Sequence, residues 1–223
     1  MNERSQINLS LKMLTDHFKK GNELVLDSTK ITQDKATGDI SWRRYTSGIL
    51  SPSNYAEEYR HLLDGGQYSI LLEDQSFIQF YYSFKGDKLH KARLAYYPSP
   101  YDFRLTDFDN EEVEDLLNSG ISYQEIYEGI EMRFSTHLRI DYDGDVKSHA
   151  KAHMQFSAIN ALRIDLEYCI LPAAFFDFIV ENFYPEHHSD MSPCPRYCTM
   201  LGHARNNKIK QKSYRTNLYL TTK

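Results

Sequence analysis

Three β-rich runs that follow one another with very short connections constrain the fold most strongly. The runs are Tyr68 to Leu72, Ser76 to Phe84 and Leu89 to Pro98, separated only by Glu73-Asp74-Gln75 and Lys85-Gly86-Asp87. Both connections are short and polar, and the second contains glycine, so an antiparallel meander is predicted. Aromatic residues make up 13% of the chain, with 17 Tyr and 12 Phe. Because such residues favour strands and bury large areas, the sheet is expected to be rich in aromatic side chains.

Helical patterns lie on both sides of the meander. Ser10 to Lys20 has apolar residues at helical spacing and is followed by Gly21, Pro52 precedes a short amphipathic segment, and Asn110 to Gly129 has an acidic helical pattern. Pro172 is expected to begin a further helix, because Pro suits the first turn and an apolar stripe follows it. That stripe consists of Phe175, Phe176, Ile179, Val180 and Phe183.

Further extended segments lie between the helical ones. Leu24 to Tyr45 is expected to form extended pieces around the single Trp42, and Arg133 to Tyr142 to form a strand that ends in an Asp143-Gly144-Asp145 turn. His153 to Ala158 and Ala161 to Tyr168 are expected to form a hairpin. Helices around an antiparallel sheet make an α+β domain, and 223 residues suit a single domain.

Composition favours an intracellular protein. No apolar run approaches the ~18 residues that a membrane-spanning helix needs, and the first residues lack the features of a signal peptide. Three cysteines, Cys169, Cys194 and Cys198, are an odd number in a chain of this size. A disulfide framework is therefore not expected, and reduced thiols in the cytoplasm fit better.

The charge is distributed unevenly along the chain. From Met191 onward there are seven basic residues and no acidic one, whereas the preceding part carries 19 basic and 31 acidic residues. We therefore divide the chain into an acidic α+β body at 1–190 and a basic C-terminal segment at 191–223. The segment could bind RNA or DNA phosphates, or it could dock on the acidic body of its own chain or of a protein partner. The residues predicted to bind are Arg205, Lys208, Lys210, Lys212 and Arg215.

The stretch from Arg139 to Arg163 holds the residue types that carry chemistry. It contains Asp141, His149, His153 and Arg163, which we take as candidate catalytic residues. One interpretation is acid–base catalysis by the two histidines with Arg163 stabilising a phosphate, as in a metal-independent ribonuclease. A second is a divalent metal bound by the aspartate and both histidines. A third is purely structural, with the histidines bonded to backbone groups at the end of a hairpin.

The sequence contains two other candidate metal motifs. Asp141, Asp143 and Asp145 begin like a calcium loop, but the loop requires Gly and an acid where Val146 and Ala152 stand, so we exclude it. A later group of potential zinc ligands has tolerated spacing but no second Cys-x-x-Cys, and an irregular loop is the alternative. That group consists of His187, His188, Cys194, Cys198 and His203. The phosphate-loop, dinucleotide and nucleophile-elbow motifs are absent from the sequence.

The same stretch resembles a bacterial family known as domain of unknown function 2290. The matching pieces run from about Tyr68 to Pro185, and they are most specific between His149 and Tyr184. They are Arg139-Ile140-Asp141-Tyr142, the His149/His153 pair, Arg163-Ile164-Asp165, and Pro172 to Tyr184. Ala150 and Asp165 stand where the family pattern has proline. The resemblance implies the fold and the choice of site residues, but no reaction, and such families often accompany phage-defence genes.

Two functions of different class follow from these observations. One is a non-catalytic or accessory subunit of a bacterial multi-protein complex, in phage defence for example, with a protein partner from the same operon. The other is a nucleic-acid hydrolase that uses the His/His/Arg/Asp site. The missing family prolines and the absence of a recognised catalytic motif favour the subunit. We expect no cofactor, apart from the divalent metal ion of the second interpretation, and no membrane association.

Overall fold

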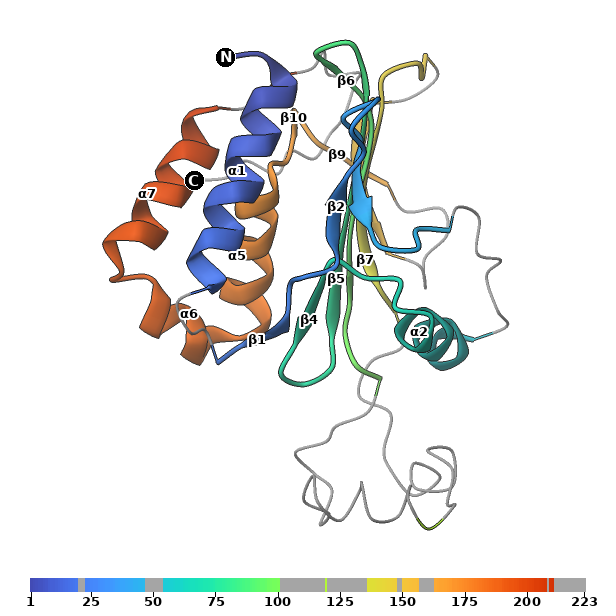
Figure 1. The fold of residues 1–223 in the computed structure, drawn as a ribbon, viewed down its shortest axis with the longest axis vertical. Helices are drawn as coiled ribbons and strands as arrows, with labels where there is room; N and C mark the ends of the chain where they lie inside the picture. The colour runs from blue at the N-terminus through green and yellow to red at the C-terminus, as the bar shows by residue number, and fades with distance from the viewer. Residues whose placement is uncertain are drawn as a thin grey trace.

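The protein is built around one antiparallel sheet with helices on both faces (Figure 1). The computed structural model describes residues 1–19, 23–46, 54–100, 119, 136–147, 150–156, 163–207 and 209–210. Nine strands of this described part form the sheet, in the order β1-β4-β5-β6-β7-β8-β9, with the β2–β3 hairpin attached to β5 through β3. The predicted α+β class with an antiparallel, aromatic-rich sheet is therefore confirmed.

The elements have the following bounds. The strands of the sheet are β1 (Val25–Asp27), β2 (Ile31–Gln33), β3 (Ile40–Trp42), β4 (Ile70–Leu72), β5 (Phe77–Lys85), β6 (Lys88–Tyr97), β7 (Leu138–Asp143), β8 (Ala152–Phe156) and β9 (Ile164–Asp165). The described helices are α1 (Glu3–Phe18), α2 (Tyr55–Asp64), α5 (Pro172–Phe183), α6 (Pro185–Met191) and α7 (Pro195–Asn206). Two short strands, β10 (Tyr168–Cys169) and β11 (Ile209–Lys210), form a separate antiparallel pair. None of the described helices is long and apolar enough to cross a membrane.

The predicted meander is present as β4, β5 and β6. These strands pair antiparallel, and the β5–β6 register runs from Phe77 opposite Tyr97 to Lys85 opposite Lys88. Gly86 in the connecting turn has φ +60°, which is a conformation that glycine adopts at little cost. Strand β7 then pairs antiparallel with β6 although about forty residues separate them in sequence. This pairing brings Arg139–Asp141 into the centre of the sheet.

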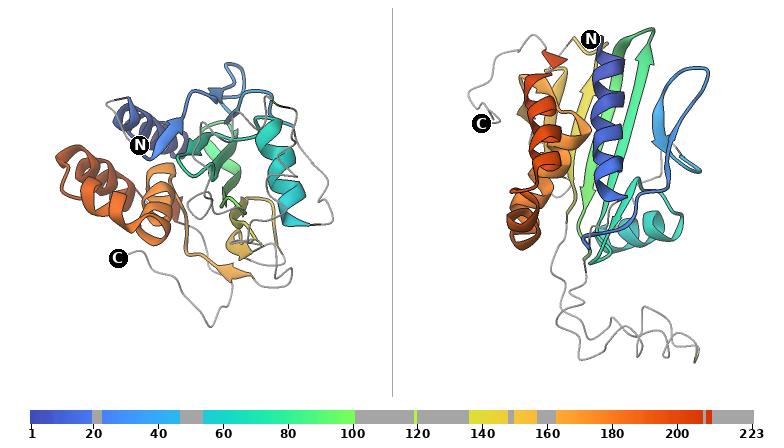
Figure 2. Two further views of the ribbon diagram at one scale, coloured as in Figure 1. Left: turned by 90° about the horizontal axis from the view of Figure 1, so that it is seen from below. Right: turned by 60° about the vertical axis from the view of Figure 1, so that its left-hand side comes forward.

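Helices α1 and α5 cover one face of the sheet, and α7 packs against both of them (Figures 1 and 2). The Pro172 helix forms as predicted, and its Phe175 packs on the sheet with its ring 6.2 Å from that of Phe80. No side chain from its own N-terminus caps α5. Instead, the backbone N–H of Ala173 donates to Oγ of the fully buried Ser10 in α1 over 3.1 Å. The two helices therefore share a hydrogen bond as well as an apolar contact.

Helix α2 covers only one end of the opposite face (Figure 2). It begins at Tyr55 because the side chain of Asn54 caps the N–H of Glu57, and it buries Tyr55 and Tyr59 against Phe77 and neighbouring residues of the sheet. The β2–β3 hairpin, which pairs with β5 through β3, lies farther along the sheet. Between these two elements the face of β6, β7 and β8 carries polar side chains, and this is where the candidate site lies.

Two sequence predictions differ from the structure or fall outside it. Helix α1 begins at Glu3 rather than at Ser10, because the side chain of Asn2 accepts the N–H of Ser5 over 2.8 Å and caps the helix seven residues earlier than the periodicity suggested. The acidic helical pattern at Asn110 to Gly129 lies outside the described residues, apart from Ser119.

In the predicted basic segment, α7 packs against α1 and α5 and buries Tyr197 completely.

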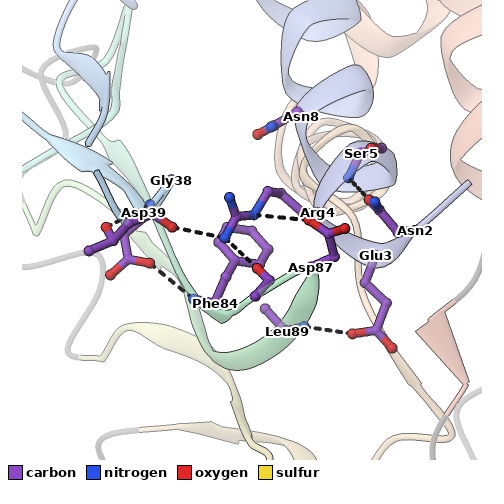
Figure 3. Close-up of polar contacts among 12 residues, drawn as sticks. Asn2, Glu3, Arg4, Ser5, Asn8, Gly38, Asp39, Phe84, Asp87 and Leu89 are labelled. Atoms are coloured by element: carbon purple, nitrogen blue, oxygen red, sulfur yellow. Dashed lines mark hydrogen bonds and ion pairs between the residues drawn. The ribbon is translucent and has the colours of Figure 1, made fainter. Parts of the chain in front are cut away.

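The N-terminus of α1 is fixed to two turns of the sheet by Arg4 (Figure 3). Its guanidinium donates to the backbone carbonyls of Thr37, over 2.9 Å, and of Gly86, and it lies 5.1 Å from the centre of the Phe84 ring. Close by, the carboxylate of Glu3 accepts the N–H of Leu89 over 2.6 Å. These contacts orient the helix across the sheet.

Gly38 is expected to be indispensable for this arrangement. It has φ +77°, and a Cβ there would lie 2.7 Å from Nη1 of Arg4. We expect Gly38→Ala to lower the free energy of unfolding by about 2–3 kcal/mol, combining the left-handed strain with lost Arg4 bonds. Gly86→Ala is the matched control, since φ is +60° and no atom lies within 4 Å of its Cβ, so it should cost only about 1 kcal/mol. If urea unfolding showed the same loss of stability for Gly38→Ala and Gly86→Ala, the contact of Gly38 with Arg4 would not matter for stability.

Candidate functional site

A row of five side chains crosses the polar face of the sheet from β5 to β9. Strand register pairs Tyr81 with Arg93, Arg93 with Asp141, Asp141 with His153, and His153 with Asp165. Directly paired residues of antiparallel strands point to the same side, so the five side chains share one face. Their neighbours along the strands, such as Leu94 or Ile140, point into the helix-covered core instead.

Asp141 is the centre of this row. Its carboxylate accepts hydrogen bonds from Nε of Arg139 over 2.8 Å, Nε of Arg93 over 3.2 Å and Nε2 of Gln155 over 2.7 Å. The Asp141 side chain is only 17% exposed, whereas that of Arg93 is 50% exposed. Three of the roughly four acceptor positions of this carboxylate are therefore occupied. The arrangement fixes the aspartate and orients the two guanidinium groups.

The four predicted catalytic residues are only partly brought together. Asp141 and His153 are direct strand partners, and His153 is buried with 6% exposure. Arg163 is exposed and stands just before β9, where the register puts Asp165 rather than Arg163 opposite His153. His149 lies outside the described residues. The acid–base interpretation therefore rests on one described histidine.

A second polar group lies at the α2 end of the same face. His137, just before β7, is 5% exposed, and its Nδ1 lies 3.8 Å from Oε2 of Glu58 in α2. The hydroxyl of Tyr97 donates to the other carboxylate oxygen over 3.1 Å, and the Tyr97 ring lies 4.4 Å from the His137 ring. Burial, together with the nearby guanidinium of Arg139, lowers the pKa of His137 to about 4. Burial also raises the pKa of Glu58. At neutral pH His137 is therefore uncharged.

Most of these partners were not among the predicted site residues. His137, Arg139 and Asp141 alternate with Leu138 and Ile140, which is the pattern of a strand with one polar and one apolar face. That alternation could have identified His137 and Arg139. The remaining partners, Arg93, Gln155 and Glu58, come from other elements, and only the strand register and the position of α2 bring them to the site.

Tyrosine and arginine side chains form the accessible end of the row, and we call Tyr45, Tyr81 and Arg93 the Tyr–Arg platform. Tyr45 follows β3 and is 38% exposed, and its ring stacks on Tyr81 with a centroid distance of 5.1 Å and an interplanar angle of 17°. The rings of the buried Trp42 and of Tyr45 form a T-shaped pair with a centroid distance of 5.0 Å. Arg93 stands directly opposite Tyr81 and is fixed by its bond to Asp141. The platform presents two stacked aromatic rings beside a guanidinium group.

Comparison with known proteins supports the family assignment. A family model described as Uncharacterized conserved protein (DUF2290) matches residues 24–220. The chain is a member of this family. The match includes every residue of the cross-strand row and of the group around His137. No curated protein and no solved structure matches the chain.

The two positions at which the resemblance led us to expect proline lie at or near β8 and β9. Ala150 is 2% exposed and precedes β8, and Asp165 is the strand partner of His153. A proline at 165 would remove a backbone N–H from β9 and place no charge beside the histidine. In this chain the row ends in the carboxylate of Asp165.

The predicted metal ligands can be placed only in part. Among the residues that the structure describes, no three His, Cys, Asp or Glu side chains are grouped to hold a metal ion. In the zinc group, His187 lies 2.8 Å from Glu73 and His188 lies 3.4 Å from Asp177, while Cys194 stands at the N-terminus of α7. The set Asp141, His149 and His153 includes a residue outside the described part, so the divalent-metal interpretation stays untested.

The predicted binding residues of the basic segment are likewise described in part. Nη2 of Arg205 in α7 lies 3.9 Å from Oδ2 of Asp177 in α5, so one basic residue of the segment already pairs with the acidic body. Lys210 ends β11. Lys208, Lys212 and Arg215 lie outside the described residues.

Asp141→Asn is expected to lower the free energy of unfolding by about 2 kcal/mol, because it leaves two guanidinium groups without their countercharge. Asp143→Asn on the same strand is the matched control. Asp143 pairs with Lys91 at 3.4 Å, and its side chain is about twice as exposed as that of Asp141. Loss of its charge should therefore cost under about 0.5 kcal/mol. Urea unfolding followed by Trp42 fluorescence measures both. Similar values for the two variants would contradict the central role of Asp141.

Proposed function

We propose that the protein is a non-catalytic accessory subunit of a bacterial multi-protein complex, and that it binds a protein partner through the Tyr–Arg platform. The family resemblance suggests phage defence as the setting. The observation that carries the proposal is the state of Asp141, whose carboxylate is held by Arg93, Arg139 and Gln155. Because three donors hold this carboxylate, it is better suited to fixing the neighbouring side chains than to accepting a proton from a substrate.

The composition of the platform also supports binding. Tyrosine and arginine are enriched among the residues that contribute most to protein–protein affinity, because they combine large contact area with hydrogen-bond donors. Here both are ordered before a partner arrives: Tyr45 stacks on Tyr81, and Arg93 is bonded to Asp141. Pre-ordered side chains lose less conformational entropy on binding. The platform is therefore suited to a partner with an acidic and apolar surface.

Nucleic-acid hydrolysis is the alternative, and one observation favours it. His153 is the strand partner of Asp141, and the guanidinium groups of Arg93 and Arg139 lie in the same part of the face. A histidine base beside two arginines is an arrangement that can stabilise a phosphoryl transition state. In that case His153→Ala would abolish cleavage of labelled RNA or DNA while the variant still folds.

Binding to the products of neighbouring genes tests the proposal. We expect Arg93→Glu and Tyr45→Ala each to weaken a complex at least about 10-fold, equivalent to about 1.4 kcal/mol. Of the two variants, Tyr45→Ala should disturb the fold less than Arg93→Glu, because Tyr45 is exposed. Lys12→Glu is the control for charge, because Lys12 is exposed on α1 at the other face of the sheet. Unchanged affinity of both platform variants would contradict the proposal.

A further inference from the structure

A cavity of about 480 Å³ lies between the sheet and helices α5 and α7. The sheet contributes Ile140 of β7 and Met154 of β8, which are strand partners and directly precede or follow Asp141 and His153 of the polar row. Since successive side chains of a strand point to opposite faces, the cavity and the Tyr–Arg platform lie on opposite sides of the sheet. A volume of this size lies within the range of about 300–1,000 Å³ that is typical of small-molecule sites.

Helix α5 presents two stripes of side chains to its surroundings. The first is buried in the core and consists of Phe175, Phe176, Ile179 and Val180. The second lines the cavity at helical spacing and consists of Ala174, Asp177, Phe178, Glu181 and Asn182. Residues three and four apart lie on one side of a helix, so this second stripe gives the cavity an aromatic ring and two carboxylates side by side.

The other walls of the cavity are mainly apolar. The side chains that form them come from helix α7 and from the segment that precedes α5, and include Leu166, Ile170, Leu171, Leu201 and Ala204. Together with Phe178 and the two sheet residues, they suit the hydrocarbon or aromatic body of a ligand, because burying apolar surface in such a site is favourable.

Asp177 is the most buried of the charged residues that line the cavity, with 8% exposure. Its Oδ1 accepts the hydroxyl of Tyr197 over 2.8 Å and lies 3.4 Å from Nε2 of His188. Among the residues that the structure describes, none donates a hydrogen bond to its Oδ2, and Nη2 of Arg205 is 3.9 Å away. A carboxylate oxygen removed from water gains most from a charged donor. Oδ2 is therefore available to the cationic group of a ligand.

The charges around Asp177 favour a cation over an anion. Glu181 stands one helical turn after Asp177 on the same side of α5, at an exposed position of the cavity rim. The guanidinium of Arg205 is 57% exposed and already faces Asp177. A ligand carboxylate at this place would meet two carboxylates, whereas an ammonium group would lie between two opposite charges.

We propose that this cavity binds a small amphipathic amine. Its apolar body lies against Ile140, Phe178 and Leu201, and its ammonium group donates a hydrogen bond to Oδ2 of Asp177, with Glu181 close by. Three observations carry the inference: the apolar walls, the buried carboxylate with an available oxygen, and the second carboxylate one turn farther along α5. The inference is independent of the function proposed for the opposite face of the sheet.

Three ligands with the same phenylbutyl body test this inference on the full-length protein. They are 4-phenylbutylamine, 4-phenylbutanol and 4-phenylbutyrate, and ligand-observed NMR titrations give their dissociation constants. We expect the amine to bind at least about 10-fold more tightly than the alcohol, and the carboxylate to bind most weakly. Equal affinities for the three ligands, or no binding of the amine, would overturn the proposal.

Substitutions of the acidic residues show whether the cavity is responsible for this preference. Asp177→Asn keeps an oxygen that can accept the hydroxyl of Tyr197 but removes the charge, so it should weaken amine binding at least about 10-fold and leave alcohol binding unchanged. Glu181→Gln changes an exposed position, cannot disturb the core, and should weaken amine binding about 3-fold.

Asp190→Asn is the matched control, because Asp190 is exposed on α6 and is not part of the cavity lining. It should leave the affinity for the amine unchanged. If Asp177→Asn lost alcohol binding as well, its fold would be disturbed, and Glu181→Gln would decide. Amine binding that Glu181→Gln leaves unchanged, or that Asp190→Asn weakens equally, would overturn the proposal.

Discussion

Replacing Phe176 by alanine is expected to lower the free energy of unfolding by about 3–5 kcal/mol. Phe176 is fully buried in α5, and its ring meets that of Phe18 in α1 edge-on with a centroid distance of 5.0 Å. The preceding Phe175 points to the sheet instead, so consecutive phenylalanines attach α5 to two different partners. Removing the Phe176 ring loses its transfer free energy and leaves a cavity between helices that cannot close on their own. Chemical unfolding followed by Trp42 fluorescence gives the value.

Phe183→Ala provides the matched control on the same helix. Phe183 is 36% exposed, although its ring lies 4.8 Å from that of Tyr96. Its removal exposes less apolar surface to water and creates no enclosed cavity, so a loss of about 1 kcal/mol is expected. If Phe183→Ala were as destabilising as Phe176→Ala, the packing of α1 on α5 would not be the main support of this layer.

Acidification is expected to remove about 3 kcal/mol of stability through His137. Its pKa is lowered from 6.5 to about 4 in the folded protein because burial disfavours the charged ring. The unfolded chain therefore takes up the proton first as the pH falls. The stabilisation is complete above about pH 6.5, decreases between pH 6.5 and 4, and is absent below that range. Free energies of unfolding measured at several pH values across this window should show the decline.

The variant His137→Gln separates this effect from other titrating groups. Glutamine does not titrate, so the variant should lose less stability than the wild type between pH 6.5 and 4. Burial raises the pKa of Glu58, and this contribution has the opposite sign: it favours the folded state at low pH and disappears as the pH rises. His61→Gln, at an exposed position of α2, is the control and should keep the wild-type profile. If the free energy of unfolding of the wild type and of His137→Gln changed with pH in the same way, His137 would not be the source of the decline.

Local patterns in the sequence were sufficient to predict much of the fold. The β4–β5–β6 meander follows from two short polar connections, and α5 follows from a proline with an apolar stripe behind it. Both signals lie within a few residues of the structure that they specify. The start of α1 was missed because its first turn is specified by the cap at Asn2 and not by apolar periodicity.

The candidate site was less predictable, because its contacts connect distant parts of the chain. Arg93 and Asp141 are 48 residues apart, and Glu58 and His137 are 79 apart. Each pair depends on the register of β6 with β7 or on the position of α2, and neither can be deduced from local periodicity. The sequence grouped Asp141 with His153, and the two are strand partners, but it could not show that two arginines and a glutamine surround the aspartate.

The engagement of Asp141 changes the interpretation of the whole face. Considered by residue type alone, an aspartate and a histidine on adjacent strands suggest acid–base chemistry. In the structure the aspartate accepts hydrogen bonds from Arg93 and Arg139, and Arg93 is also part of the Tyr–Arg platform. The same residues can thus form a binding surface, with the stability of that surface depending on the central carboxylate.

A native mass spectrum of the full-length protein, co-expressed with the products of its neighbouring genes, tests the central claim most directly. The account predicts a defined complex with one of these proteins, and a much smaller share of complex when Tyr45 is replaced by alanine. A complex that is equally abundant with Tyr45→Ala, or a chain that remains alone in every combination, would contradict the proposal that this sheet face binds a protein partner.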